Sequence, residues 1–566
     1  MKKYHFCRTV LASVLCGAMI LSFTSCKSPD SKSESKAAAS GGSEVTTLKG
    51  VTIVPSSVGD YTKSRLQQAM VKATGVKVNW DVISSDKMNV LLAGGDLPDL
   101  LIVSDSYFKQ LIEGDNVVAM DDLFKDTKSV TKTIPKTIEL SKKFWSDGQN
   151  KTYFLPVQVG KDGVGAEQVS GLVLRWDYYK ELGYPEINNI DDALSVINKM
   201  VKAHPKAENG KKVFGLSGWT DWGTWNYTYP MSALMGYYQT NSPTVELNVV
   251  SNEMDNVLMD ENSPYWQSVK YYYKANQMGI LDPDTFTQKN SDFTTKATNG
   301  QYASIPAQWA SGDFNSNNAK DGKGFVVIPL KWGCQWGEAT NVLGYTDKCY
   351  AISKNCKNPQ AAMKFIDYVY SYDGCRTMYS GFQGTDWTAN NGKPALKDST
   401  LALSKSGGTE WKNTGIGYDS TFIGLSGFTT NPGDNASVNL FDDTSTFPRS
   451  LSNLQTSFCK HYNVSYPNEI FQNIVKQGKV KNQSGENTLA LALMPPETND
   501  IGRFDSNLGT IAAQYGAKLS LAKNDSEFAS LKQQAMAAFK QAGSDKVFDW
   551  YNTNWADCVK KSSSMQ

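Results

Sequence analysis

Aromatic side chains crowd together in residues 219–229, where tryptophans recur at intervals of three. The stretch reads Trp219-Thr220-Asp221-Trp222-Gly223-Thr224-Trp225-Asn226-Tyr227-Thr228-Tyr229. An indole ring stacks on flat or ring-shaped ligands, and the CH-rich face of a sugar ring is such a surface. Carboxylate and amide groups, here Asp221 and Asn226, bond the hydroxyl groups of a sugar. The stretch therefore has the chemistry of a sugar-binding loop; the alternative for any one tryptophan is a place in the core.

Other loops pair an aromatic ring or a polar group with glycine in the same way. Arg175 is a further candidate for hydrogen bonds to hydroxyl groups, with a structural salt bridge as its alternative. Gln158 is a further candidate because it lies beside the segment expected to join the two domains. The remaining ring and carboxylate candidates in such loops are Trp309, Trp332, Trp336, Asp386 and Trp387.

The N-terminal part of the chain predicts a sheet that would place two more carboxylates. Apolar periodicity predicts strands at 51–54, 76–82 and 100–103, with helices at 60–73 and 86–93 between them. Strands and helices alternating at these lengths indicate a parallel α/β sheet, whose ligands bind beyond the carboxyl ends of its strands. Asp105 directly follows the third strand. Asp96 lies in the Gly94-Gly95 turn, where glycine permits close backbone approach.

Further elements are expected around the aromatic stretch. A strand at 213–216 would precede it, and the spacing of its three tryptophans would put them on one face of a helix. The Asp147-Gly148 pair predicts a turn between two aromatic strands. The segment from Ile190 to His204 has the pattern of an amphipathic helix with acidic residues in its first turn.

Length and composition exclude several classes of function. The 566 residues exceed what one core usually supports, so two or more domains are expected. A net charge of +1 produces no strong positive field that would attract nucleic acid or an anionic membrane. Only three histidines are present, and no nucleotide-binding, metalloprotease or serine-hydrolase motif occurs. No spacing selects a glycosidase carboxylate pair, so we expect binding without turnover and no cofactor.

The first 46 residues have the pattern of an export signal and a tether. Basic residues precede a short apolar run at 10–23, and then comes Thr24-Ser25-Cys26. This is a signal peptide over 1–25. Its end resembles a bacterial lipobox, with Phe23 as a departure, so Cys26 is expected to be lipidated; the alternative is ordinary cleavage nearby. Residues 26–46 are rich in small and polar residues and predict a flexible tether. The body would be anchored to the outer face of the cytoplasmic membrane or to the cell surface.

Six cysteines follow the lipobox, and their state is left open. Export permits disulfides, but free buried thiols are an equal alternative. No spacing matches a zinc site. These residues are Cys334, Cys349, Cys356, Cys375, Cys459 and Cys558.

Five stretches in order resemble the family 1 group of bacterial extracellular solute-binding proteins, in its lipoprotein branch for complex carbohydrates. They cover about residues 48 to 390. They are Ala93-Gly94-Gly95-Asp96-Leu97-Pro98-Asp99, Lys151-Thr152-Tyr153-Phe154-Leu155-Pro156, Leu174-Arg175-Trp176-Asp177-Tyr178-Tyr179-Lys180-Glu181-Leu182-Gly183, Gly279-Ile280-Leu281-Asp282-Pro283-Asp284-Thr285-Phe286 and Ile352-Ser353-Lys354-Asn355-Cys356-Lys357-Asn358-Pro359-Gln360-Ala361-Ala362.

The resemblance implies a periplasmic-binding-protein-like α/β fold of two lobes joined by a multi-strand hinge. Lobe 1 would comprise 47–157 and about 346–445; lobe 2 would comprise 158–345 and about 446–566 with the C-terminal helices. A monomer would close on a carbohydrate, and permease subunits of an ABC importer would be its membrane partners. The aromatic content favours an oligosaccharide. The alternatives are a peptide or other solute, a surface carbohydrate-active enzyme, or an adhesin-type lipoprotein.

Two segments bear on metal binding. Relatives of this branch often carry a calcium-type loop after the helix that corresponds to 190–204. Here residues 204–212 retain few oxygen ligands beside three lysines, so no calcium is expected there. The segment that begins at Asp313 echoes an EF-hand loop but has Gly324 where glutamate is required, so it is rejected.

Overall fold

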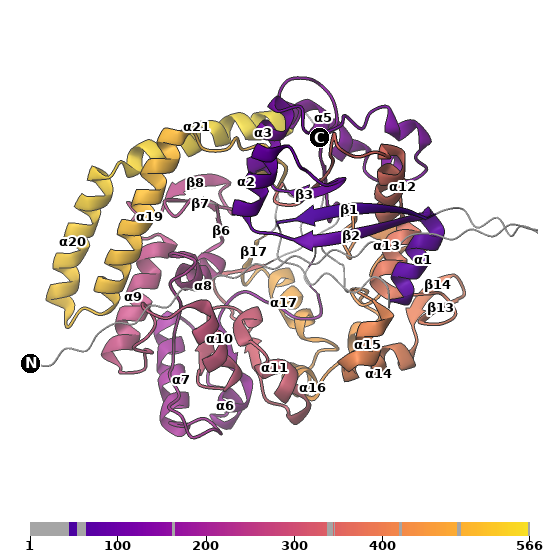
Figure 1. Cartoon of the computed structure of the whole chain (residues 1–566). Coiled ribbons are helices and arrows are strands. Elements are labelled where there is room, and N and C mark those ends of the chain that lie inside the picture. The colour runs from indigo at the N-terminus through magenta and orange to yellow at the C-terminus, as the bar shows by residue number, and fades with distance from the viewer. Residues whose placement is uncertain are drawn as a thin grey trace, which may run out of the picture. The chain divides into compact units, whose positions relative to one another are not determined.

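A computed structural model describes residues 45–53, 64–160, 163, 165–240, 242–336, 343, 346–417, 422–483 and 488–563 (Figure 1). The predicted signal peptide, Cys26 and nearly all of the predicted tether lie outside the described residues. The backbone, but not the side chain, is described for Trp336, Asn390, Asn482, Gln483 and Thr488. From Val45 onward the chain forms one compact unit.

The first layer of the fold is a five-stranded sheet in the order β2-β1-β3-β12-β4. β1 pairs in parallel with β2 and β3, which confirms the predicted parallel arrangement, whereas β12 runs antiparallel to β3 and β4. The last two strands come from later in the chain and close one side of the sheet. The strands are β1 (Thr46–Thr52), β2 (Val76–Val82), β3 (Leu100–Val103), β4 (Leu155–Pro156) and β12 (Cys349–Ile352).

Helices cover both faces of this sheet because the strand side chains alternate between two hydrophobic clusters. Leu100 and Ile102 of β3 pack into one cluster, and Leu101 and Val103 pack into the other. Helices α1 and α12 contribute to the first cluster, and α2, α3 and α5 contribute to the second. Their bounds are α1 (Arg65–Thr74), α2 (Ser85–Gly94), α3 (Phe108–Glu113), α5 (Pro135–Phe144) and α12 (Pro359–Val369).

The ends of these helices follow local capping chemistry. Ser84 caps α2 by accepting a hydrogen bond from the Lys87 N–H, at 3.2 Å. Gly95 ends α2 in the left-handed conformation, with a φ of 70°. The capping glycine is therefore Gly95, whereas Gly94 is the last helical residue.

A second, larger hydrophobic core surrounds a three-stranded antiparallel sheet in the order β10-β5-β9. A separate antiparallel sheet, β6-β7-β8, packs on the same core. The strands are β5 (Val173–Arg175), β6 (Tyr237–Gln239), β7 (Val245–Asn248), β8 (Glu253–Asn256), β9 (Ser304–Ile305) and β10 (Phe325–Val327). The helices of this core are α6 (Trp176–Glu181), α7 (Ile190–Ala203), α8 (Trp225–Met235), α9 (Pro264–Gln277), α10 (Asn290–Thr298) and α11 (Phe314–Asn318).

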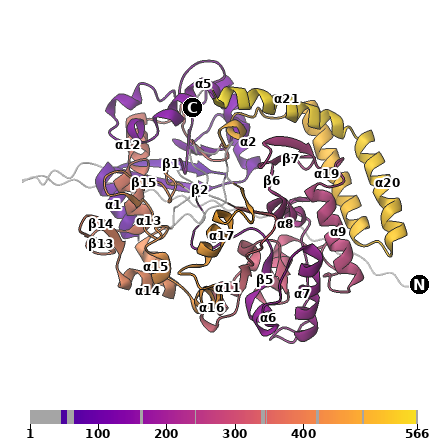
Figure 2. The same ribbon diagram turned by 180° about the vertical axis from the view of Figure 1, so that it is seen from behind.

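The C-terminal helices pack mainly on this second core. Figures 1 and 2 show α19, α20 and α21 in yellow, running past α9 and the β7–β8 strands. The short α18 is different, because Leu489 belongs to the core of the five-stranded sheet and the Trp145 indole N–H donates to the Ala492 carbonyl at 3.3 Å. The helices are α16 (Asn453–Tyr462), α17 (Pro467–Lys476), α18 (Thr488–Ala492), α19 (Asn499–Ser520), α20 (Asp525–Gln541) and α21 (Ser544–Ser563).

The remaining short elements connect or flank the two cores. β11 and β17 form a parallel pair, and two small antiparallel pairs and four further helices lie along the chain. They are β11 (Cys334–Trp336), β13 (Trp387–Asn390), β14 (Lys393–Leu396), β15 (Thr430–Asn431), β16 (Ala436–Ser437), β17 (Lys481–Gln483), α4 (Val130–Thr133), α13 (Tyr372–Ser380), α14 (Asp398–Ser406) and α15 (Gly408–Thr414).

Two local predictions are wrong. The residues before Asp147 end helix α5, so they do not form the first of two aromatic strands. Residues 213–216 make isolated bridges at Phe214 and Leu216 instead of a strand. In both places aromatic and apolar residues follow the demands of the core, which short-range pattern does not reveal.

The six cysteines that follow the lipobox are buried thiols, and none of them is in a disulfide. Burial raises the pKa of Cys375 to about 12 and that of Cys356 to about 11. The second of the two alternatives, free buried thiols, is therefore the observed state. These thiols act as small apolar side chains in the cores.

A pair of carboxyl groups couples the C-terminal helices to the β6–β7 loop. Asp505 on α19 accepts hydrogen bonds from the hydroxyl groups of Ser242 and Thr244, at 2.6 and 2.8 Å. Glu497 accepts from the Tyr551 hydroxyl at 3.0 Å. Burial and the neighbouring Asp505 charge raise the pKa of Glu497 to about 7.

This pair predicts a stability that depends on pH. Because the folded-state pKa of Glu497 is raised, its contribution to stability is complete below about pH 4.5 and is lost as pH rises through about 7. Glu497→Gln should therefore raise the melting temperature at pH 8 by about 2 °C and have little effect at pH 5. The exposed Glu410→Gln is the control for loss of a surface charge. Calorimetry that shows equal shifts at both pH values would contradict this account.

Candidate functional site

Three tryptophans gather into what we call the tryptophan patch, made of Trp222, Trp225 and Trp309. The ring centroids of Trp222 and Trp309 are 5.9 Å apart at an interplanar angle of 31°, and those of Trp225 and Trp309 are 6.0 Å apart at 33°. Trp222 and Trp309 are 46% and 41% exposed, and they are the only exposed tryptophans whose side chains the structure describes. Two neighbouring indole faces thus remain available to a ligand.

Local structure explains how the patch forms. Residues 221–224 make a turn, and α8 begins only at Trp225, so the prediction that three tryptophans share one helical face is wrong. Trp309 lies in a 3-10 turn, Gln308–Ser311, which follows β9. The patch is therefore assembled from a turn, the first residue of a helix and a turn after a strand.

A buried amide holds the turn against the helix. Asn226 Oδ1 accepts from the Trp219 N–H at 3.0 Å, and its Nδ2 donates to the carbonyls of Trp219 and Gly223 at 2.7 and 3.3 Å. Asn226 is fully buried. Its hydrogen bonds are used to shape the loop, so Asn226 is a positioning residue and not a partner for sugar hydroxyls.

Trp219 forms the base under the patch. Its side chain is 2% exposed and packs edge-on against Trp222, with centroids 5.2 Å apart, and against Trp309, at 6.2 Å. Phe293 closes its other side at 4.7 Å. Trp219 was a predicted ligand residue; the structure places it below the exposed rings, where it fixes their positions.

Sequence reasoning missed the side chains that border the patch. Tyr229 lies one helical turn after Trp225, with ring centroids 4.7 Å apart, and its hydroxyl pairs with Ser170. The Val169 carbonyl accepts from the Gln308 N–H at 2.9 Å, and Val169 is itself exposed. The (i, i+4) spacing from Trp225 is the signal that could have identified Tyr229.

Asp221 lies beside the patch and is exposed. Its Oδ1 accepts a hydrogen bond from the Asn290 N–H, at the beginning of α10, at 2.9 Å. One carboxylate oxygen is thus committed to holding α10 near the turn. The carboxylate lies next to Trp222 in the chain, at the rim where a stacked ring would present its hydroxyl groups.

A second group of predicted residues meets at the edge of the five-stranded sheet. The register places the end of β3 and the end of β4 beside the start of β12. Asp105 accepts a hydrogen bond from the Thr346 hydroxyl there. The Lys348 ammonium donates to Gln158 Oε1 at 3.2 Å. We call Asp105, Gln158 and Lys348 the sheet-edge group; it lies where ligands bind in open α/β sheets.

Asp96 is exposed in the turn that ends α2. The Asn355 amide donates to the carbonyls of Gly95 and Leu97, at 2.7 and 3.1 Å, and so fixes this turn to the segment after β12. Asp99 accepts from the Lys49 N–H at 2.8 Å and serves the fold. Asp96 therefore faces solvent before the start of β3, at the end of that strand opposite the sheet-edge group.

Arg175 has a structural environment. It is buried at the end of β5, and its guanidinium forms two hydrogen bonds with Asp177, at 3.0 and 2.6 Å. A third bond goes to the Gly300 carbonyl at 3.3 Å, and the rings of Tyr178 and Phe314 lie 4.2 Å away. The alternative of a structural salt bridge describes Arg175, and we leave it out of the candidate site.

Three more predicted residues have contacts of the same structural kind. Trp332 donates its indole N–H to the Ile187 carbonyl at 2.9 Å and packs on the second core. Asp386 is buried and pairs with Arg65, and Trp387 donates to the Gly381 carbonyl at 3.0 Å. We leave these out of the site as well. Trp336 ends β11, and its side chain lies outside the described residues.

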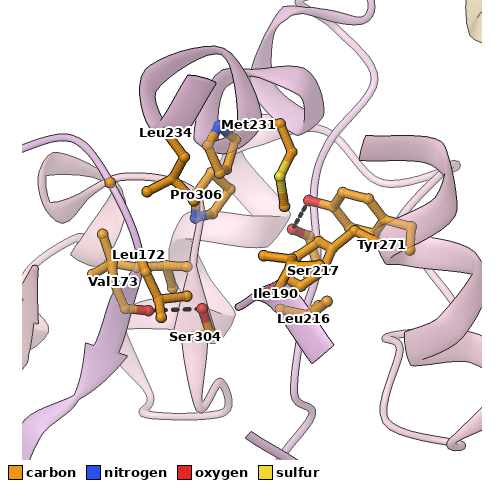
Figure 3. Close-up of a pocket in the computed structure, with 14 residues that line it drawn as sticks. Leu172, Val173, Ile190, Leu216, Ser217, Met231, Leu234, Tyr271, Ser304 and Pro306 are labelled. Atoms are coloured by element: carbon orange, nitrogen blue, oxygen red, sulfur yellow. Dashed lines mark hydrogen bonds between the residues drawn. The ribbon is translucent and has the colours of Figure 1, made fainter. Parts of the chain in front are cut away.

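Two cavities flank α8. The smaller one, of about 20 Å³, lies in the second core under Leu234 and Met231 (Figure 3). Its polar groups are satisfied, since Ser304 Oγ donates to the Val173 carbonyl at 2.7 Å and the Tyr272 hydroxyl donates to the Ser217 carbonyl at 3.2 Å. It has room for about one water molecule. The larger cavity, of about 220 Å³, adjoins the tryptophan patch.

The segment after α7 is held by protein contacts. Glu208 pairs with Lys323, and Asn209 Oδ1 accepts from the Lys211 N–H at 3.0 Å. Among the described residues, no group of three or more acidic, histidine or cysteine side chains is arranged to hold a metal ion. The expectation that this segment binds no calcium stays a prediction.

Comparison with known families agrees with this architecture. The model of the bacterial extracellular solute-binding protein family matches residues 59–374, more than half of the chain. The protein is therefore a member of this family, as the sequence motifs indicated. No curated protein sequence matches the chain.

Solved structures show the same periplasmic-binding-protein-like α/β fold at low sequence identity. One is the Streptococcus pneumoniae ABC-transporter substrate-binding protein FusA, an EF-hand mutant in complex with fructo-nystose. It is 15% identical, with a TM-score of 0.59 over 92% of this chain and 100% of that one. A solute-binding protein of Bifidobacterium longum infantis, described as binding HMO, is 15% identical, with a TM-score of 0.56 over 91% and 99%.

A third similar structure is the N-glycan transport solute-binding protein NgtS of Streptococcus pneumoniae with Man1GlcNAc. It is 12% identical, with a TM-score of 0.51 over 91% of this chain and 100% of that one. In the described part of the present chain, no helix has the length and apolar character needed to cross a bilayer.

The burial of the tryptophans predicts unequal effects of truncation. Trp219→Ala should lower the free energy of unfolding by about 3–5 kcal/mol, because it leaves a cavity under the patch. Trp222→Ala should lower it by about 1 kcal/mol, because much of that ring is already in water. Denaturant titration of the two variants measures the difference. Equal losses would mean that Trp222 belongs to the core.

Proposed function

We propose that this protein is an exported substrate-binding lipoprotein that delivers an oligosaccharide to an ABC importer. Family membership supports the role in solute capture. Carbohydrate ligands bound in similar structures support the ligand class. The signal sequence and the Cys26 lipobox support a lipid anchor on the outer face of the membrane.

The observation that carries the proposal is the tryptophan patch. Trp222 and Trp309 expose neighbouring indole faces at a shallow angle, which suits successive rings of a sugar chain. Buried Trp219 and the Asn226 amide hold these faces in place before a ligand arrives. Preorganisation of this kind lowers the entropic cost of binding.

We infer that the two cores act as lobes that close on the ligand. Lobe 1 would contain the five-stranded sheet, residues 47–157 and about 346–445; lobe 2 would contain residues 158–345 and about 446–566. In both views α8 is drawn between strands β1 and β2 and helix α7. The sheet-edge group would supply polar contacts from lobe 1, whereas Asp96 lies at the opposite end of β3, away from that group. A ligand that contacts both lobes favours the closed state, which the permease would recognise.

We propose that the site binds its ligand without catalysing a reaction. The exposed carboxylates Asp221, beside the patch, and Asp105, in the sheet-edge group, each already accept a protein hydrogen bond. A surface carbohydrate-active enzyme would reveal itself by releasing sugar, and an adhesin by binding polymer without uptake. A peptide ligand would use the same indole faces, so the ligand screen includes peptides.

A thermal-shift screen of residues 26–566 with Cys26→Ala tests the ligand class. The screen uses mono- and oligosaccharides and di- to pentapeptides. A ligand at about 100 times its dissociation constant should add about 2.7 kcal/mol of stability. We expect shifts with oligosaccharides. Shifts with peptides and with no glycan would refute the sugar assignment.

Variants of the patch test its location. Trp222→Ala and Trp309→Ala should each weaken glycan binding about tenfold or more, because a stacked ring at the centre of a site often contributes about 1.4 kcal/mol or more. Trp550→Ala on α21, partly buried and packed on Tyr551, is the matched control and should bind normally. Isothermal titration calorimetry gives the affinities. Normal binding by both patch variants would move the site elsewhere.

A further inference from the structure

The larger cavity beside α8 has features of a ligand compartment; we call it the Glu246 cavity. It lies between α8, the β6–β7 hairpin, α9 and α19, and Trp222 and Trp225 form the wall that it shares with the tryptophan patch. Its volume of about 220 Å³ exceeds the roughly 150 Å³ of an engineered cavity that binds benzene. One six-membered ring, or a branch of similar size, fits this volume.

A buried carboxyl group faces this space without satisfying all of its hydrogen-bonding capacity. Glu246 on β7 is 4% exposed and lines the cavity, and its Oε2 has no hydrogen-bond partner among the described residues. Gln239 on β6 donates through Nε2 to Thr228 Oγ1 at 2.7 Å, while its Oε1 also lacks a partner there. Buried polar atoms are normally paired, so these two acceptors are available to a donor that enters the cavity, either water or a hydroxyl group of a ligand.

The other polar groups of the cavity wall are already engaged. The Tyr265 hydroxyl donates to the Ala512 carbonyl at 2.8 Å, and Ser242 Oγ donates to Asp505 at 2.6 Å. The Thr240 hydroxyl donates to the Val245 carbonyl at 2.5 Å. The acceptor atoms of the cavity that lack a partner among the described residues are therefore Glu246 Oε2 and Gln239 Oε1.

The protonation state of Glu246 selects among donors. Burial raises the pKa of Glu246, and hydrogen bonds from Ser232 and Gln239 lower it by less. The resulting pKa is about 7. Both the protonated and the charged form are then populated near neutral pH. A hydroxyl group can donate to the charged form and accept from the protonated one, whereas an ammonium group matches only the charged form.

We propose that the Glu246 cavity is a second compartment of the ligand site. It would accept a hydroxyl-bearing terminal ring or branch of the glycan that stacks on the tryptophan patch, with O–H groups donating to Glu246 and Gln239. This inference rests on the proposed function. It adds that the ligand does not only lie along the exposed indoles but bends behind Trp222, so that the protein selects glycans by their end or branch.

The test compares Glu246 variants with a patch variant. The protein comprises residues 26–566 with the Cys26→Ala change. The probes are maltotriose, 1-kestose and a branched mannopentaose, each titrated into it in a calorimeter at pH 7. Glu246→Gln keeps the shape and Glu246→Met removes both acceptors. For the glycan bound most tightly, the Met variant should lose at least tenfold in affinity and the Gln variant several-fold. Glu253→Gln, an exposed change on the neighbouring strand β8, should bind normally.

The stability of the unliganded variants separates a binding role from a structural one. Because burial disfavours the charged form of Glu246, the Gln variant should melt at or above the wild-type temperature at pH 8. Weaker binding with unchanged or higher stability supports the compartment. If both variants bind more weakly and both also melt at a lower temperature than the wild type, the proposed compartment is refuted.

The outcomes also separate this inference from the proposed function. If Trp222→Ala weakens glycan binding while both Glu246 variants bind like the wild type, the compartment is refuted and the patch stands. If none of the three glycans binds and Trp222→Ala changes nothing in the wider ligand screen, the proposed function itself fails.

Discussion

The candidate site depends on one buried amide. Asn226 reaches back from the first turn of α8 and holds the backbone of Trp219 and Gly223, so that the loop before the helix has a single shape. A buried amide left without partners costs about 1–3 kcal/mol, which makes any other loop conformation unfavourable. The exposed rings of Trp222 and Trp309 pack on each other and on the buried Trp219 beneath them.

The two cores around the site are separate in composition but are not independent. Segment 165–170 borders the patch and is tied to α17, since Gln168 donates to Asn468 at 2.9 Å. Helix α18 contributes Leu489 to the core of the five-stranded sheet, while the Cys558 thiol of α21 donates to the nearby Leu493 carbonyl at 3.2 Å. The C-terminal region therefore contacts both cores, since α18 contributes Leu489 to one and Ala490 to the other.

Much of the first core could be predicted from the sequence because its signals are local. The alternation of apolar residues in β2 and the serine and glycine caps of α1 and α2 are sufficient to place these elements. The Gly94-Gly95 turn was found for the same reason. The aromatic stretch was recognised by residue type alone, and its exposure at Trp222 and burial at Trp219 follow from packing that no spacing reveals.

The predictions that failed, or that the structure leaves out of the site, required contacts between distant parts of the chain. Asp386 was selected as a polar group in a glycine loop, but it pairs with Arg65 from the other end of the first core. The Glu246 cavity needs a wall from α19, to which Gly509 contributes. Arg175 is the exception, because its partner Asp177 is two residues away and the pairing could have been read from the sequence.

The six buried thiols have a consequence for how the protein reaches its fold. With no covalent cross-link among the described residues, stability comes from the cores alone and does not vary with the reduction potential of the surroundings. Folding of the described part of the chain then requires no oxidant and no disulfide isomerase. It also cannot be trapped by a mispaired bridge once the sulfur atoms are inside the cores, where thiolate formation is suppressed.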